Sequence, residues 1–209
     1  MGQLPDLNQA RRRLGLALSS LRHDRWVLGY LRGGTMQPIA ASEISRRLLE
    51  SHTLMPLSRR ALFERKPAVV NSVVDAAAGE NDYDWELDWP AILYAPVGEL
   101  GQRPIGLLIV GCRTDHWYGD EDIAFAHTLG FSLAPMVSAL RGPLSRFNHR
   151  ETMAAQLLSH GFSVAEVARA MDVGEPMARS LVDKVTRRLQ SITDSDLRFP
   201  AIQVKRMIW

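Results

Sequence analysis

Hydrophobic and polar positions along the first part of the chain follow two different periods. Four leucines near the start recur at spacings of seven, four and three residues: Leu7, Leu14, Leu18 and Leu21. This helical spacing predicts a helix over residues 4–21. Residues 25–32 are aromatic and branched apolar and run into a glycine pair, so they predict a strand that returns along 35–42 as a hairpin.

The middle of the chain predicts further strands and short helices. We expect helices over 42–50 and 58–65, and strands over 68–74, 91–97 and 103–112. Residues 79–89 hold five acidic side chains and are expected to form an exposed loop. The order of these elements predicts an α+β fold around an antiparallel sheet.

The most apolar segment begins after the acidic stretch 118–122 and predicts a long helix to about Leu140. Apolar residues occupy every side of this helix, so one side is expected to lie on a sheet and the other on a helix of this chain or of a second copy. Pro135 removes one backbone donor and predicts a kink. The Gly- and Pro-containing stretch 141–145 predicts a domain boundary.

The first part of the chain resembles a GAF domain. The resemblance covers residues 5–141 and depends on YAPVGELGQRPIGLLIVG (94–111), YGDEDIAF (118–125) and the long apolar helix. It implies a central antiparallel sheet with a side pocket. It also implies a homodimer formed through the first and last helices of this domain.

Residues 150–189 predict three short amphipathic helices. The first, 150–160, ends at a glycine; the second begins with a Ser163–Glu166 capping box. After the turn 172–176, a third helix has an apolar inner side and a polar, basic outer side. Two amphipathic helices joined by a tight turn have the geometry of a helix-turn-helix.

The string LLSHGFSVAEVARAMDVGEPMARSLVDKVTRRL (157–189) resembles the LuxR-type helix-turn-helix. The resemblance implies binding of double-stranded DNA and puts four residues of the third helix at DNA-facing positions: Arg179, Ser180, Lys184 and Arg187. We expect the neighbouring Arg188 to bind DNA as well. Two positions depart from the family pattern. Met177 replaces the usual threonine, which meets a phosphate, and Gly174 replaces the usual capping serine.

Composition and charge are consistent with this division. The chain has 209 residues and a net charge of +2. Residues 1–141 carry 15 basic and 16 acidic side chains, whereas residues 142–209 carry 10 and 7. We therefore predict a GAF-like sensor and dimerisation domain over 1–141, a linker over 142–149, and a small all-α helix-turn-helix domain with a C-terminal tail over 150–209.

Cellular location and bound groups are predicted mostly by absences in the sequence. The single cysteine excludes a disulfide framework and multi-cysteine zinc sites. Apolar runs stay below the roughly 18 residues of a membrane span, and no basic leader precedes an apolar core, so we expect a cytoplasmic protein without a membrane partner. Neither covalent bilin attachment at Cys112 nor haem ligation by His116 or His127 is favoured, and we expect no cofactor and no metal.

An apolar pocket for an unidentified small molecule is the remaining candidate site of the first domain. Five residues are candidates for its lining: Trp26, Tyr30, Tyr94, His116 and Trp117. The alternative interpretation is that most of them are core or interface residues and that the domain is only a dimer scaffold.

The sequence therefore predicts a bacterial, homodimeric, DNA-binding transcription regulator with a sensor domain. The alternative is a signalling adaptor that uses both domains for contacts between proteins. We do not expect an enzyme, because a GAF-type methionine sulfoxide reductase relies on several cysteines and no nucleophile has a placed base. The ligand, the operator, and the roles of loop 79–89 and tail 191–209 stay open.

Overall fold

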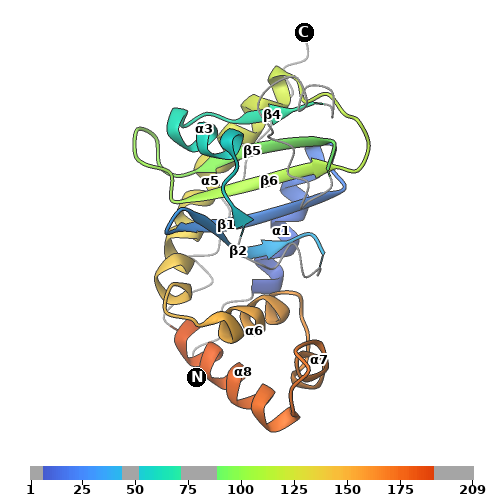
Figure 1. Ribbon diagram of the computed structural model, residues 1–209, viewed down its shortest axis with the longest axis vertical. Helices are drawn as coiled ribbons and strands as arrows, with labels where there is room; N and C mark the ends of the chain where they lie inside the picture. The colour runs from blue at the N-terminus through green and yellow to red at the C-terminus, as the bar shows by residue number, and fades with distance from the viewer. Residues whose placement is uncertain (1–6, 44–51, 72–88, 191–209) are drawn as a thin grey trace.

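The computed structural model describes residues 7–43, 52–71 and 89–190 (Figure 1). A sheet flanked by helices makes up the upper part of the molecule in this view, and helices α6, α7 and α8 make up the lower part. Residues 44–50 of the helix expected over 42–50, the acidic loop over 79–89 except for Trp89, and the tail over 191–209 lie outside the described residues.

The described strands form one antiparallel sheet in the order β3-β2-β1-β6-β5-β4. Their bounds are β1 Arg25–Arg32, β2 Thr35–Ala41, β3 His52–Thr53, β4 Ala68–Val70, β5 Ala91–Val97 and β6 Gly106–Cys112. The predicted antiparallel sheet is thereby confirmed. Strand β6 begins three residues later than predicted, at a point just after Pro104, which has no backbone N–H to donate to a neighbouring strand.

The predicted hairpin of β1 and β2 turns at the glycine pair. Gly33 and Gly34 have φ angles of 57° and 82°. Positive φ at both central residues is the signature of a type I′ turn, whose twist matches that of the flanking strands. This geometry explains why two glycines occupy the turn.

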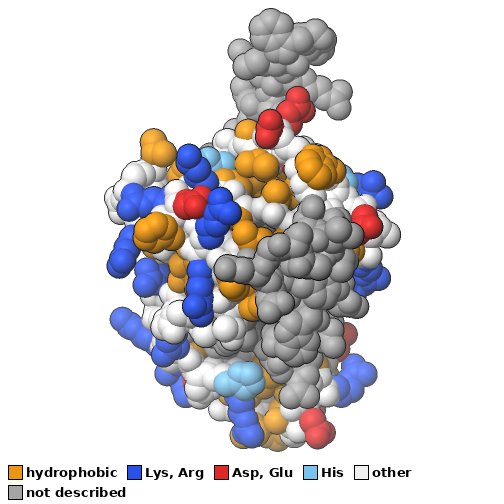
Figure 2. All heavy atoms as spheres, turned by 45° about the horizontal axis from the view of Figure 1, so that its top comes forward, with side chains coloured by type: hydrophobic (Ala, Val, Ile, Leu, Met, Phe, Trp, Pro, Cys, Tyr) orange, Lys and Arg blue, Asp and Glu red, His pale blue; other side chains and the backbone are white. Residues whose placement is uncertain are grey.

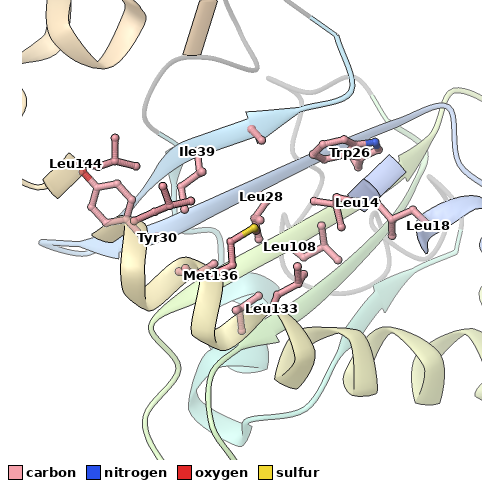
Figure 3. Packing of buried hydrophobic residues seen from close by; sticks show 14 of the residues in the cluster. Leu14, Leu18, Trp26, Leu28, Tyr30, Ile39, Leu108, Leu133, Met136 and Leu144 are labelled. Carbon is pink, nitrogen blue, oxygen red and sulfur yellow. The ribbon is translucent and has the colours of Figure 1, made fainter. Parts of the chain in front are cut away.

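Helices cover both faces of the sheet. Helix α1 (Leu7–Ala17), its 3₁₀ extension η1 (Leu18–Ser20) and helix α5 (Asp120–Leu144) pack on one face, and α3 (Pro56–Glu64) packs on the other. Figure 3 shows leucines of α1 and η1 beside residues of α5 and of the central strands. Because both faces are covered, every residue of β5 and β6 is buried.

The alternation of side chains along the central strands builds two apolar layers. Leu28 and Leu108 face α1 and α5, whereas Val27 and Ile109 face α3. Full burial of one such side chain stabilises the fold by about 2 kcal/mol. Helix α5 comes especially close to the sheet at Gly130, where a Cβ atom would lie 2.2 Å from the Pro96 carbonyl oxygen.

Helix α5 ends four residues later than predicted and includes part of the expected linker. Leu144 is 5% exposed and belongs to the core, so its burial favours another turn of helix although Pro143 cannot donate a backbone hydrogen bond. Among the described residues, α5 is the one helix long and apolar enough to cross a membrane by length and composition. It packs on the sheet, and the core helix of a globular fold meets the same criterion.

The lower part consists of α6 (His149–Ser159), α7 (Val164–Ala170) and α8 (Glu175–Leu189), which we call the three-helix unit. Its helices lie close to the predicted ranges. Their shared core contains these buried residues: Ala154, Leu157, Val167, Ala168, Ala178, Val185 and Leu189. The turn between α7 and α8 includes Asp172 in the left-handed conformation, with φ of 51°.

The three-helix unit packs directly against the upper part. Helix α6 contacts α1 and β2, and one hydrophobic cluster runs through both parts. Gln156 of α6 donates a buried hydrogen bond of 2.9 Å from Nε2 to the carbonyl oxygen of Pro38 in β2. The two parts are therefore joined by apolar and polar contacts as well as by the chain itself.

Candidate nucleic-acid interface

The outer side of α8 is exposed to solvent. Arg179, Ser180 and Arg187 all lie on this side, together with the carboxylates of Glu175 and Asp183. These side chains line an open hollow of about 430 Å³. We call this surface the outer face of α8. It presents guanidinium and hydroxyl donors, and it is not covered by other described residues.

Lys184 and Arg188 lie on the flank of α8 that faces α6, where they meet the carboxylate of Glu151. Lys184 Nζ lies 2.6 Å from Glu151 Oε1, and Arg188 donates from one terminal guanidinium nitrogen to Oε2 at 2.7 Å. The Arg188 guanidinium also donates to the Arg146 carbonyl oxygen and lies over the ring of Phe147. Their contact with DNA stays a prediction, but the structure gives both cations another partner.

The carboxylate of Glu151 is buried, with a side chain only 2% exposed. Burial by itself would raise its pKa. The hydrogen bond from Lys184, the backbone N–H of Asn148 and the charge of Arg188 outweigh this effect and hold the pKa of Glu151 below its ordinary value of 4.5. Glu151 is therefore a buried anion at neutral pH, and it fixes α6 to α8.

Side-chain caps set the start of α6 and α7, whereas α8 begins without one. Glu151 Oε2 accepts from the Asn148 N–H, and Asn148 Oδ1 accepts from the Glu151 N–H. The predicted Ser163–Glu166 capping box is present on α7. Gly174 precedes α8 with no side-chain cap, as expected from its lack of a side chain.

The five residues predicted to line a ligand pocket do not come together among the described residues. Trp26 and Tyr30 are buried on the sheet face covered by α1 and α5 (Figure 3), whereas Tyr94 is buried on the face covered by α3. Trp117 is 72% exposed, and His116 is half-buried, edge-on to Tyr118. The described residues therefore give no shared pocket for these five side chains, and a ligand pocket stays a prediction. Trp26 pairs with Val110 and Tyr94 with Ile109, neighbouring positions of β6 whose side chains point to opposite faces of the sheet.

The single cysteine lies in the core. Cys112 is 1% exposed, and its thiol donates to the Arg22 carbonyl oxygen at 3.4 Å and lies 3.6 Å from the Tyr118 hydroxyl. Burial raises the pKa of the Cys112 thiol, so the nucleophilic thiolate is disfavoured. Within the described ranges, no group of three His, Cys, Asp or Glu side chains has the arrangement of a metal site.

Charge alone does not locate the interface. In the view of Figure 2, in which the top of Figure 1 comes forward, Lys and Arg side chains lie on both sides of the visible face and are not gathered into one patch. Basic side chains thus occur over much of this visible face. Exposed arginines also lie on α1 and α3, so what distinguishes α8 is its position as the helix that follows α7 through a short turn.

No protein-family model matches the chain, and no curated protein sequence is similar to it. Solved structures show that the upper part has the GAF fold. The GAF domain of a phosphoenolpyruvate-protein phosphotransferase from Coxiella burnetii is 20% identical with a TM-score of 0.54, over 68% of this chain and 88% of that one. The GAF domain of a two-component sensor histidine kinase from Bacillus halodurans is 20% identical with a TM-score of 0.50, over 65% and 95%.

A third structure with this fold is the free methionine-R-sulfoxide reductase from Neisseria meningitidis. It is 12% identical with a TM-score of 0.52, over 65% of this chain and 80% of that one. At such identities the likeness concerns the fold alone. The three matches leave about a third of the chain uncovered.

Proposed function

We propose that the chain is a homodimeric, DNA-binding transcription regulator, in which a GAF-fold sensor controls the three-helix unit. The observation that carries the proposal is the outer face of α8. Its arginines and serine are exposed and lie on a helix that follows α7 through a short turn. Arginine binds phosphates and guanine edges through the same planar set of donors, and an α-helix fits the width of the major groove.

Dimerisation follows from the reach of one helix. A single recognition helix contacts only a few base pairs, so two copies related by symmetry are needed to bind two half-sites about one helical turn apart. Exposed apolar side chains on the two helices of one sheet face support a dimer through α1 and α5. Leu16 of α1 is 73% exposed, Phe131 of α5 is half-buried, and Pro135 of α5 is exposed.

A sensory role for the upper part is supported by its fold, which also occurs in a sensor histidine kinase. The contact between β2 and α6 gives such a sensor a direct route to the three-helix unit. A small molecule that changed the packing of the sheet would shift α6 through Gln156 and its apolar neighbours. It would act as an effector only if the two arrangements differ in their affinity for DNA.

The test is binding of labelled DNA duplexes across a salt series. Arg179→Ala and Arg187→Ala should each weaken binding about tenfold and leave the dimer intact. Each should also reduce the slope of the logarithm of the binding constant against the logarithm of the salt concentration by about one per protomer. Arg59→Ala on α3 is the matched control, because it removes one exposed arginine from the other end of the molecule. Lys184→Ala is less informative, since it also removes an ion pair to Glu151.

Two outcomes would contradict the proposal. If the unaltered protein binds no duplex at low salt, the DNA-binding role is wrong and the three-helix unit serves contacts between proteins. If both arginine variants bind like the unaltered protein while Arg59→Ala weakens binding, the outer face of α8 is not the interface.

A further inference from the structure

The flank of α8 that faces α6 carries more positive charge than its buried acid can neutralise. Glu151 contributes one carboxylate, and it is shared between Lys184 and Arg188. Both cations keep part of their surface in solvent, with side chains 48% and 37% exposed. The ion pairs therefore leave one net positive charge at this flank, next to the outer face of α8.

Arg150 of α6 adds a third cation to the same flank. Its side chain is exposed, and one terminal guanidinium nitrogen lies 4.0 Å from the sulfur of Met177 in the first turns of α8. A thioether sulfur is a weak acceptor, so this contact positions the guanidinium without satisfying it. Among the described residues, no ion pair joins Arg150 to a carboxylate.

The backbone of Arg150 is held firmly although its side chain is exposed. It lies between the helix start at Asn148–His149 and Glu151, whose carboxylate accepts from the Asn148 N–H and pairs with two cations of α8. The guanidinium thus projects from a fixed turn of α6 beside the start of α8. Contacts that set the register of a protein on a duplex have this arrangement, in which a rigid element presents a basic side chain to the phosphate backbone.

We propose that Arg150 binds a DNA phosphate at the edge of the groove occupied by α8, although it belongs to a different helix. The inference rests on the proposed function. When a helix lies in the major groove, the phosphate backbones form the walls on either side. The flank of α8 with Lys184 and Arg188, beside which Arg150 of α6 lies, would then face one of these walls. A guanidinium can donate two parallel hydrogen bonds to one phosphate, which an ammonium cannot.

The experiment measures duplex binding by fluorescence anisotropy over a salt series, with the full chain and two unrelated mixed-sequence duplexes of about three helical turns each. Arg150→Ala should weaken binding about five- to tenfold on both duplexes alike and reduce the salt slope by about one per protomer. Arg150→Lys should retain the salt slope but bind more weakly than the unaltered protein. Arg59→Ala is the control for loss of one exposed charge, and the melting temperature of each variant verifies folding.

The outcomes separate this inference from the proposed function. If Arg179→Ala and Arg187→Ala weaken binding but Arg150→Ala leaves affinity and salt slope unchanged, Arg150 is no phosphate contact while α8 remains the interface. If Arg150→Ala weakens binding on one duplex only, the residue reads base sequence and the inference is wrong. If the unaltered protein binds neither duplex, the proposed function and this inference fall together.

Discussion

Glu151 holds the charged side chains of the three-helix unit together. It is buried, it caps the start of α6, and it pairs with two cations of α8. Removal of a buried charge from such a network leaves its former partners partly desolvated and unpaired. Because Lys184 and Arg188 are themselves part-exposed, water compensates for some of that loss.

We predict that Glu151→Gln lowers the free energy of unfolding by about 2 kcal/mol at neutral pH. This value lies between the loss expected when a fully buried ion pair is broken and the loss expected for a surface pair. Chemical denaturation measures this directly. The matched control is Glu64→Gln, which removes the exposed Arg60–Glu64 pair of α3 and should cost at most about 0.5 kcal/mol. Equal losses for the two variants would contradict the role given to Glu151.

The difference in stability between the unaltered protein and Glu151→Gln should depend on pH. The pKa of Glu151 is lower in the folded state than its ordinary value of 4.5, so its contribution to stability is complete above that pH and is lost as the pH falls through the folded pKa. The stabilities of the unaltered protein and Glu151→Gln should therefore converge below about pH 4.5. Burial also lowers the pKa of His160 to about 4, but this contribution occurs in both proteins and cancels.

For single residues, the sequence predicted which side chains of α8 point away from the core of the three-helix unit, because the spacing along a helix is a local property. It did not predict that Lys184 and Arg188 turn to Glu151, since Arg188 and Glu151 are 37 residues apart and meet only through the packing of α6 on α8. The Asn148–Glu151 spacing is a capping-box pattern and could have indicated the helix start, though not the ion pairs.

Among the elements, α6 has the most consequential position, because it belongs to the three-helix unit and also packs on β2 and α1. Its Gln156 is 2% exposed and bonds to the Pro38 carbonyl oxygen. Loss of this donor would leave a buried carbonyl without its partner, which costs more than the net value of one hydrogen bond.

We predict that Gln156→Ala lowers the free energy of unfolding by about 1–3 kcal/mol and increases hydrogen exchange along β2 and α6 more than along β5 and β6. Gln102→Ala is the control, since Gln102 is exposed and bonds only within its own turn, to Glu99. Unchanged exchange at β2 and α6 in Gln156→Ala would show that the two parts are not coupled at this contact.

The periodicity of the sequence predicted which helices and strands form, but where each of them ends depended on tertiary contacts. Strands β1, β2 and β5 agree with their predicted ranges to within one residue, because their apolar runs end at clear turn signals. Helix α5 passes its predicted end because Leu144 is buried in the core. The aromatic residues predicted to line a pocket lie on both faces of the sheet, because aromatic composition does not tell which face each ring will occupy.

The whole molecule joins a GAF fold to a helical unit through a continuous apolar cluster. Its proposed dimer places α1 and α5 of two copies together. Leu16 projects from α1 with 73% of its surface exposed, on the sheet face that α5 also covers. A carboxylate at this position would have to be buried without a partner in such a dimer.

We predict that Leu16→Glu shifts the protein from dimer to monomer, with at least about a tenfold rise in the dissociation constant measured by analytical ultracentrifugation. Phe63→Glu is the matched control, because Phe63 is 89% exposed on α3, on the opposite face of the sheet. If Phe63→Glu dissociates the dimer and Leu16→Glu does not, the dimer forms through the other face.

Cross-linking from position 180 shows whether the outer face of α8 lies against DNA. Cys112 is the chain's one cysteine and is buried, so Ser180→Cys can be labelled selectively with a photoactivatable group, and Arg59→Cys provides the same label on α3. At low salt, the label at position 180 should cross-link to a bound duplex, and the label at position 59 should not. A duplex that binds the protein but is cross-linked from position 59 and not from position 180 would contradict it.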